Sequence, residues 1–184
     1  MGLHVTGDPD VDRLLGEDPL ALVIGMLLDQ QVPMERAFAA PYRLRERLGG
    51  ELVAERVAAM SDEEIEAVFA QKPALHRFPA SMARRTRDLC AHLVEHYGGD
   101  AARIWSAADS GAQVLHRLTT LPGYGDQKAR ILLAVLGKRL GTAPPGWREA
   151  AAPYSDEQPR SVADIDSPEA VQVVREWKRR HKAR

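Results

Sequence analysis

The sequence predicts an all-α fold, organised as a single domain over residues 1–184. Ala, Leu, Arg and Glu are abundant while aromatic residues make up 5% of the chain, and this composition favours helix over strand. Helix-capping signals recur along the sequence, each followed by apolar residues at helical spacing. Apolar residues account for 45% of the chain, which is ordinary for a protein that buries a core.

The first half of the chain contains four predicted helices. Asp18-Pro19 is a strong helix start, because Asp caps well and Pro suits the first turn. The run that follows is apolar on all sides, which is typical of a buried helix. Ser61-Asp-Glu-Glu64 is a capping box. The predicted spans are Asp10 to Leu15, Pro19 to Gln31, Pro33 to Leu48 before Gly49-Gly50, and a helix that begins at Ser61.

The second half continues the helical pattern up to residue 140 and then changes character. Four prolines between Gly141 and Arg160 exclude a long helix there, so residues 141–184 form an atypical Pro-rich C-terminal segment. A cap at Asp166-Ser167-Pro168-Glu169 predicts a final helix with a basic end. The predicted helices are Pro79 to Tyr97 before Gly98-Gly99, Ser110 to Leu118, Asp126 to Leu140, and the last helix up to Arg184.

Charge and cysteine content narrow the function classes. The net charge is −1, so a nucleic-acid-binding role requires local basic patches rather than a bulk excess. Cys90 is the one cysteine, so this chain forms no internal disulfide and holds no four-thiolate iron–sulfur cluster. No membrane-spanning run and no secretory pattern is visible, and the expected location is the cytoplasm.

The segment Leu121-Pro-Gly-Tyr-Gly125 is the most informative motif. Apolar residues at helical spacing lie on both sides, which predicts a helix-hairpin-helix at about residues 110–140. Gly123 and Gly125 leave bare N–H groups at the start of a helix, and such a site binds a phosphate oxygen without reading sequence. Lys128 follows within a turn and could add a phosphate contact. In a second interpretation, the turn simply joins two core helices.

The hairpin and two further segments resemble the helix-hairpin-helix (HhH-GPD) superfamily of base excision DNA repair glycosylases. The run ALVIGMLLDQQVPMERAFAA resembles the family's buried helix with its Gln-containing turn, and FPASMARRTRDLCAHLVEHYGGD resembles the helix before the hairpin. The similarity extends over about Pro19 to Leu140. The resemblance implies a fold of two helical lobes with a groove between them. It further implies that the protein binds and bends damaged double-stranded DNA and flips a base into that groove. It also implies a monomer without membrane association.

The resemblance assigns DNA-binding roles to two places in the chain. Gln31, with Gln30 beside it, matches the residue that fills the gap left by the flipped base. The hairpin is expected to anchor the phosphate backbone, often with a monovalent cation, Na⁺ or K⁺, held by its carbonyls; no other cofactor is expected. The DNA-binding candidates are Gln30, Gln31, Leu121, Gly123, Tyr124, Gly125, Gln127 and Lys128.

The chain departs from the family pattern at the residues that carry chemistry. The family's catalytic Asp corresponds by count to the segment Pro144 to Arg148, which contains no carboxylate. Glu149 is the leading substitute and Asp29 the alternative, although either could be an ordinary polar residue. Trp147 is a candidate base-stacking residue or a core residue. The Lys of the strand-nicking members corresponds to Gln127, and the adjacent Lys128 points about 100° away on a helix.

These observations favour a monofunctional DNA N-glycosylase of base excision repair. A catalytically inactive DNA-binding or damage-sensing protein on the same scaffold is the alternative, because the Asp is missing. Arg84, Arg85 and Arg87 lie on one predicted helix and either contact DNA or form a solvated face. His92 and His96 have a spacing that suits a metal, but no third ligand is evident.

Overall fold

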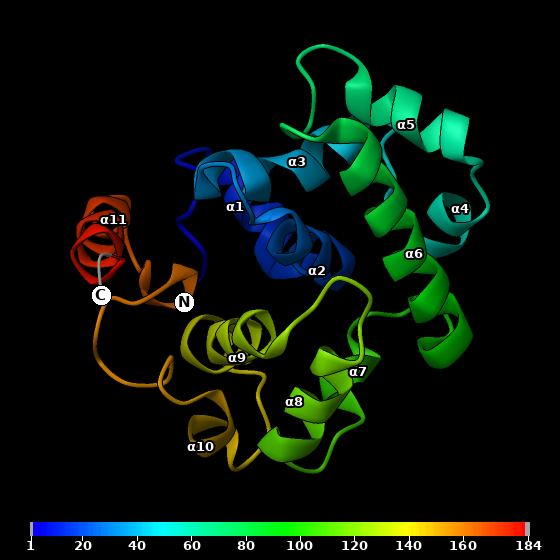
Figure 1. Cartoon of the computed structure of the whole chain (residues 1–184). Coiled ribbons are helices and arrows are strands. Elements are labelled where there is room, and N and C mark those ends of the chain that lie inside the picture. Colours follow the sequence, from blue (N-terminus) through cyan, green and yellow to red (C-terminus); the bar gives the residue numbers. More distant parts are fainter. Residues whose placement is uncertain (1, 183–184) are drawn as a thin grey trace.

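The structure, a computed structural model, describes residues 2–182, and this part of the chain is helical with no strand (Figure 1). The all-α prediction is therefore confirmed. The helices are α1 (Pro9–Glu17), α2 (Pro19–Leu28), α3 (Met34–Arg47), α4 (Ala54–Ala58), α5 (Asp62–Ala70), α6 (Pro79–Tyr97), α7 (Arg103–Ser106), α8 (Gly111–Thr119), α9 (Asp126–Val135), the π-helix η1 (Leu136–Leu140), α10 (Trp147–Ala151), the 3₁₀ helix η2 (Val162–Asp164) and α11 (Ala170–His181).

Helix α2 lies at the centre of the fold and contacts α1, α3, α6 and α9 (Figure 1). Every residue from Leu20 to Leu28 is buried, as its continuous apolar sequence predicts. The Asp18 carboxylate accepts hydrogen bonds from the amides of Leu20 and Ala21, which fixes where the helix begins. Gly25 lets α3 approach closely, because a Cβ there would lie 2.8 Å from the Phe38 ring.

The capping signals locate most helix starts, whereas one predicted helix end is wrong and another predicted helix changes type before its correctly predicted end. The Ser61 capping box is present, and α6 ends at Gly98 in the left-handed conformation, as predicted. Helix α2 ends at Leu28, three residues before the predicted Gln31, because hydrogen bonds from other segments take over its last carbonyl groups. The predicted helix from Asp126 to Leu140 is α-helical only to Val135 and continues as a π-helix.

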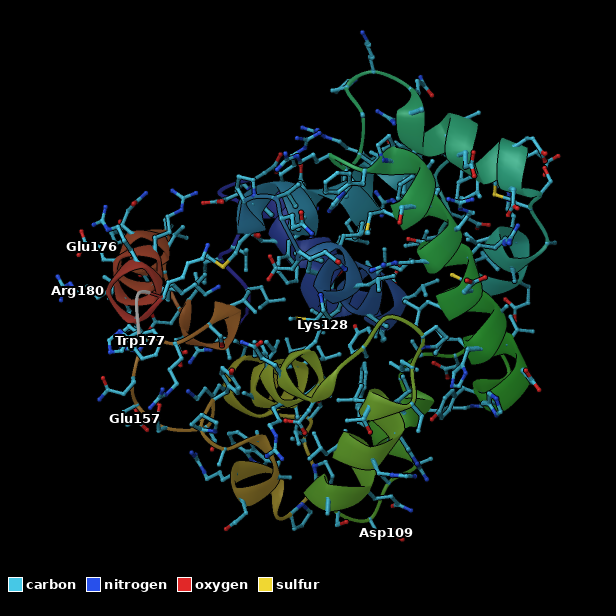
Figure 2. All side chains as sticks on the ribbon, in the orientation of Figure 1. Asp109, Lys128, Glu157, Glu176, Trp177 and Arg180 are labelled. Carbon is cyan, nitrogen blue, oxygen red and sulfur yellow. The ribbon has the colours of Figure 1, made fainter. Side chains whose placement is uncertain are left out.

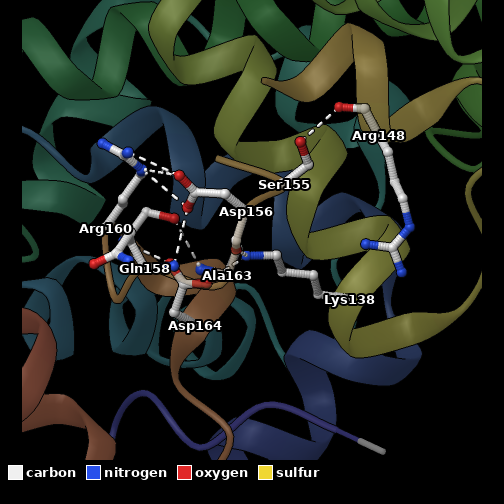
Figure 3. A network of polar contacts seen from close by, with 9 residues as sticks. Lys138, Arg148, Ser155, Asp156, Gln158, Arg160, Ala163 and Asp164 are labelled. Carbon is white, nitrogen blue, oxygen red and sulfur yellow. Dashed lines mark hydrogen bonds and ion pairs between the residues drawn. The ribbon is translucent and has the colours of Figure 1, made fainter. Parts of the chain in front are cut away.

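The Pro-rich segment after Gly141 is held on the π-helix by a polar network (Figure 3). Lys138 Nζ donates to the Asp164 carboxylate and to the Asp156 carbonyl, at 2.5 Å each. The Asp156 carboxylate in turn accepts from Nε and Nη2 of Arg160. Lys138 and Asp164 are only 11% and 10% exposed, so this ion pair is well shielded from solvent. It fixes the path of a segment that has little regular structure.

The C-terminal helix α11 packs on the rest of the molecule through a narrow apolar face and several polar contacts. Val171 and Val174 are its buried residues. The Arg160 guanidinium lies 5.0 Å from the Trp177 ring centroid, and Arg175 pairs with Glu35 at the start of α3. Within residues 2–182, every helix is too short or too polar to span a bilayer.

Candidate nucleic-acid interface

The predicted hairpin is present as α8, a tight turn and α9, and its outer face exposes backbone N–H groups. Gly125 is the N-cap residue of α9 and has no capping side chain. Within residues 2–182, the amides of Gly123, Gly125 and Gln127 have no intramolecular acceptor. Gly125 and Gln127 are exposed, so solvent or a ligand reaches this helix N-terminus, which carries a partial positive charge.

The inner face of the hairpin turn packs against α2. Leu121 and Tyr124 are 2% and 7% exposed, and the Tyr124 hydroxyl donates a 2.6 Å hydrogen bond to the Val23 carbonyl. Gly123 has φ +82°, and a Cβ there would lie 2.4 Å from Leu27 Cδ1. The side chains of Leu121 and Tyr124 therefore anchor the hairpin internally, and only its backbone remains available to a phosphate.

Lys128 reaches from α9 to the end of α2 rather than into solvent (Figure 2). Its Nζ donates to the carbonyls of Met26, Leu27 and Asp29, at 2.7, 3.1 and 3.4 Å. Burial lowers the pKa of the Lys128 ammonium, Asp29 opposes that shift, and Arg85 adds to it. The three hydrogen bonds use the three donors of an ammonium group.

Residues 29–31, the glutamine turn, follow α2 directly. Gln30 is half-buried: its Nε2 donates to the Leu27 carbonyl, and its Oε1 accepts from Arg85. Gln31 is exposed and has φ +58°, the one positive φ of a non-glycine residue among the residues described. That conformation costs an L-residue about 1–2 kcal/mol, so the surrounding contacts must enforce it.

His76 connects the glutamine turn to the loop before α6, a role that no pattern in the sequence predicts. Its Nδ1 accepts from the Phe78 amide, so Nε2 carries the hydrogen and donates to the carbonyls of Leu28 and Gln30, at 3.1 and 3.0 Å. Phe78 is 40% exposed, and the Arg77 guanidinium lies 5.2 Å from its ring centroid. One buried imidazole thus links the glutamine turn to the loop that carries the exposed Phe78.

The two candidate catalytic carboxylates occupy different environments. Glu149 is exposed on α10, and its carboxylate has no hydrogen-bond or ion-pair partner within residues 2–182. Asp29 is half-buried in the glutamine turn, and burial raises the pKa of its carboxyl above the ordinary value. The ammonium groups of Lys178 and Lys128 oppose that shift, while Glu35 adds to it. Of the two, Asp29 is the carboxylate close to hairpin and glutamine-turn residues.

The segment in which the family's Asp was expected forms the start of α10. Gly146 is the N-cap residue of this helix, and no side chain caps it. Trp147 is half-buried: a Cβ on Gly137 would lie 2.4 Å from its ring, and the Arg148 guanidinium lies 4.6 Å from the ring centroid. These neighbours give Trp147 a packing role against the π-helix.

The other residues singled out in the sequence have different surroundings in the structure. Arg84 and Arg87 pair with Glu66 and Asp62 on α5, whereas Arg85 contacts Gln30. Cys90 is fully buried, and burial raises its pKa to about 12, so it behaves as a small apolar residue. The rings of His92 and His96 lie 4.3 Å apart, but no cluster of three or more metal-binding side chains occurs within residues 2–182.

Comparison with known proteins agrees with this geometry. A model of the HhH-GPD superfamily of base excision DNA repair proteins matches residues 24–184, a span that contains the glutamine turn, the hairpin and the Pro-rich segment. A search of curated proteins found no match. The matched span is most of the chain, and the chain belongs to the HhH-GPD superfamily of base excision DNA repair proteins.

Proposed function

We propose that this protein is a monofunctional DNA glycosylase that binds damaged double-stranded DNA as a monomer, flips a base and cleaves its N-glycosidic bond. The environment of Gly125 is the observation that supports the proposed DNA binding. The residue is exposed, its backbone is extended, and a Cβ there would meet nothing within 4 Å. Because the fold does not require glycine at this position, we infer that a foreign atom must approach the backbone closely.

The exposed side chains near the hairpin suit a distorted duplex. Gln31 carries a hydrogen-bond donor and an acceptor on a planar amide at the end of a long side chain, which fits an unpaired base. Phe78 offers an exposed ring, and stacking of a base on an aromatic ring contributes about 1–3 kcal/mol. A Na⁺ or K⁺ ion at the hairpin carbonyls is part of the proposal, and duplex affinity in Na⁺ against a bulky organic cation at equal ionic strength tests it.

We assign the catalytic carboxylate to Asp29 in preference to Glu149. Cleavage of the N-glycosidic bond develops positive charge on the sugar, and a nearby carboxylate stabilises that charge. A raised pKa also suits a group that takes a proton from the attacking water. The cleavage rate should therefore fall as the pH drops through the pKa of Asp29, which lies above the ordinary Asp value.

A panel of duplexes tests the activity. Oligonucleotides carrying uracil, alkylated purines, oxidised guanine or hypoxanthine are incubated with the protein, and released base is measured by chromatography. We expect release from at least one duplex, loss of release in Asp29→Asn, and retained release in the matched control Glu149→Gln. Release that survives Asp29→Asn would refute the assignment of the carboxylate.

A damage-sensing protein without catalysis is the second candidate, and the N-cap of α10 favours it. Gly146 lies in the segment where the family's carboxylate is expected, and it has no side chain to supply one. Tight binding to abasic-site DNA together with no base release from any duplex of the panel would select this function. Activity on one duplex would exclude it.

A further inference from the structure

The carbonyl groups at the end of α2 all have donors, although the helix itself supplies few of them. Lys128 Nζ covers Met26, Leu27 and Asp29, and His76 Nε2 covers Leu28 and Gln30. Helices usually leave their last four carbonyls to water or to a glycine cap. Here two side chains from distant segments donate to five consecutive carbonyls, three of which also accept from the Asp29 amide, the Gln30 amide or Gln30 Nε2. The next residue is the strained, exposed Gln31.

We propose that Lys128 is a positioning residue that holds the glutamine turn in the shape required for recognition of damaged DNA. This inference rests on the proposed DNA-binding function. Lys128 lies three residues after Gly125, so the residue beside the phosphate-binding backbone also fixes the turn that presents Gln31. The hairpin, which binds the DNA backbone, and the glutamine turn, which presents Gln31 to the stacked bases, are thereby held together as one unit.

The contacts of Lys128 argue against a direct phosphate contact. All three ammonium donors face carbonyl oxygens of α2 and the glutamine turn, and the side chain is half-buried. Turning Nζ outward to a phosphate would remove one of two donors from each of the Met26 and Leu27 carbonyls, and the donor of the Asp29 carbonyl. The second anchor, His76, comes from the loop before α6, and its hydrogen bond from the Phe78 amide places that loop in the same arrangement. The two residues that precede the strained Gln31 are therefore each held by a side chain from a distant segment.

A positioning role for Lys128 and a direct phosphate contact predict different affinities for a pair of duplexes. One duplex contains a stable abasic-site analogue with 2-aminopurine opposite it, and the other is the undamaged duplex of the same sequence. For Lys128→Met we expect the preference for the abasic duplex to fall about tenfold, the scale of one lost set of hydrogen bonds to a base. The change in 2-aminopurine fluorescence on binding should disappear. Affinity for the undamaged duplex should change less than about twofold.

Companion variants separate positioning from general damage to the fold. Gln31→Ala should reproduce the loss of preference, and the double variant should be no worse than either single variant, because Lys128 acts through Gln31. Lys128→Arg keeps a cationic donor and should restore most of the preference and the fluorescence change. Lys72→Met removes one exposed positive charge from the loop after α5, so any effect should be equal on both duplexes. Thermal unfolding of each variant confirms that it is folded.

The outcomes that overturn the inference are distinct from failure of the proposed function. Equal weakening of both duplexes by Lys128→Met, with a salt slope smaller in magnitude by about 0.9, would make Lys128 a phosphate contact. Additive losses in the double variant, or an intact preference in Lys128→Met, would also refute the positioning role. If the unmodified protein bound neither duplex, the proposed function would fail and the inference with it.

Discussion

His76 is 1% exposed, and its two ring nitrogens serve opposite purposes. Nε2 donates to the end of α2, whereas Nδ1 must stay unprotonated to accept from the Phe78 amide. Burial lowers the pKa of His76, the two carbonyls oppose that shift, and Arg36 and Lys128 add to it. Protonation therefore breaks a hydrogen bond and places a third positive charge beside two others.

This environment predicts a loss of stability in mild acid. A lowered pKa in the folded state means that the contribution of His76 is complete above the ordinary His value of about 6.5 and is lost as the pH falls below it. Urea unfolding at pH 7.5 and 5.5 should show a smaller decrease in the free energy of unfolding for His76→Gln than for the unmodified protein. An equal decrease in both would contradict the prediction, because Gln keeps a donor but does not titrate.

The sequence predicted the roles of residues that depend on the local backbone. It did not predict roles that depend on partners far away along the chain. The glycines of the hairpin could be read from the sequence because a turn before a helix constrains its own residues. The role of Lys128 could not be read from the sequence, since its carbonyl partners precede it by 99 to 102 residues. For the same reason the sequence could not rank Asp29 above Glu149, because the burial of Asp29 and its proximity to Lys128 and Lys178 are tertiary properties.

At the scale of elements, the two hairpin glycines have different reasons to be glycine. Gly123→Ala should lower the free energy of unfolding by about 2–4 kcal/mol, because the methyl group meets Leu27 and φ is positive. Gly125→Ala should leave stability within about 0.5 kcal/mol but weaken duplex binding about tenfold, because its methyl group fills the open space in front of the exposed amides. Urea unfolding and fluorescence anisotropy measure the two effects.

The opposite pattern would refute this division of roles. If Gly125→Ala bound DNA normally, the hairpin backbone would not approach a phosphate. Gly125→Ser provides a further check: a serine N-cap should stabilise α9 by a few tenths of a kcal/mol while still blocking the amides. A variant that is more stable yet binds DNA more weakly would separate function from folding within one element.

Helix starts were predictable from capping chemistry, while helix ends depended on neighbouring elements. Ser61, Asp18 and Ser110 cap the helices that follow them, as local sequence dictates. The end of α2 is set by His76 and Lys128, and the π-helix after Val135 coincides with the packing of Trp147 on Gly137. Short helices such as α4 and α7 carry weak signals, because each of them has only a turn or so of sequence.

Over the part of the molecule that the structure describes, many of the cations pair with carboxylates or backbone carbonyls of the same chain. Lys138 pairs with Asp164, Arg175 with Glu35 and Arg130 with Asp126, and the net charge is −1. Arg84 and Arg87 are likewise neutralised by α5. A DNA-binding protein with this distribution must obtain affinity from backbone amides and side-chain fit, because bulk attraction to the phosphates is weak.

This distribution predicts an unusually shallow dependence of DNA affinity on salt. Each phosphate neutralised by a cation contributes a slope of roughly −0.9 to the plot of log K against log salt, whereas a neutral amide releases no counterion. We expect a slope no steeper than about −3 between 50 and 200 mM NaCl, measured by anisotropy on the undamaged duplex. A slope near −6 would instead require contacts from the basic end of α11, where Lys178, Arg179 and Arg180 lie. In that case, replacing Arg179 and Arg180 with Gln would make the salt slope shallower. Under the present prediction the same double substitution leaves the slope unchanged.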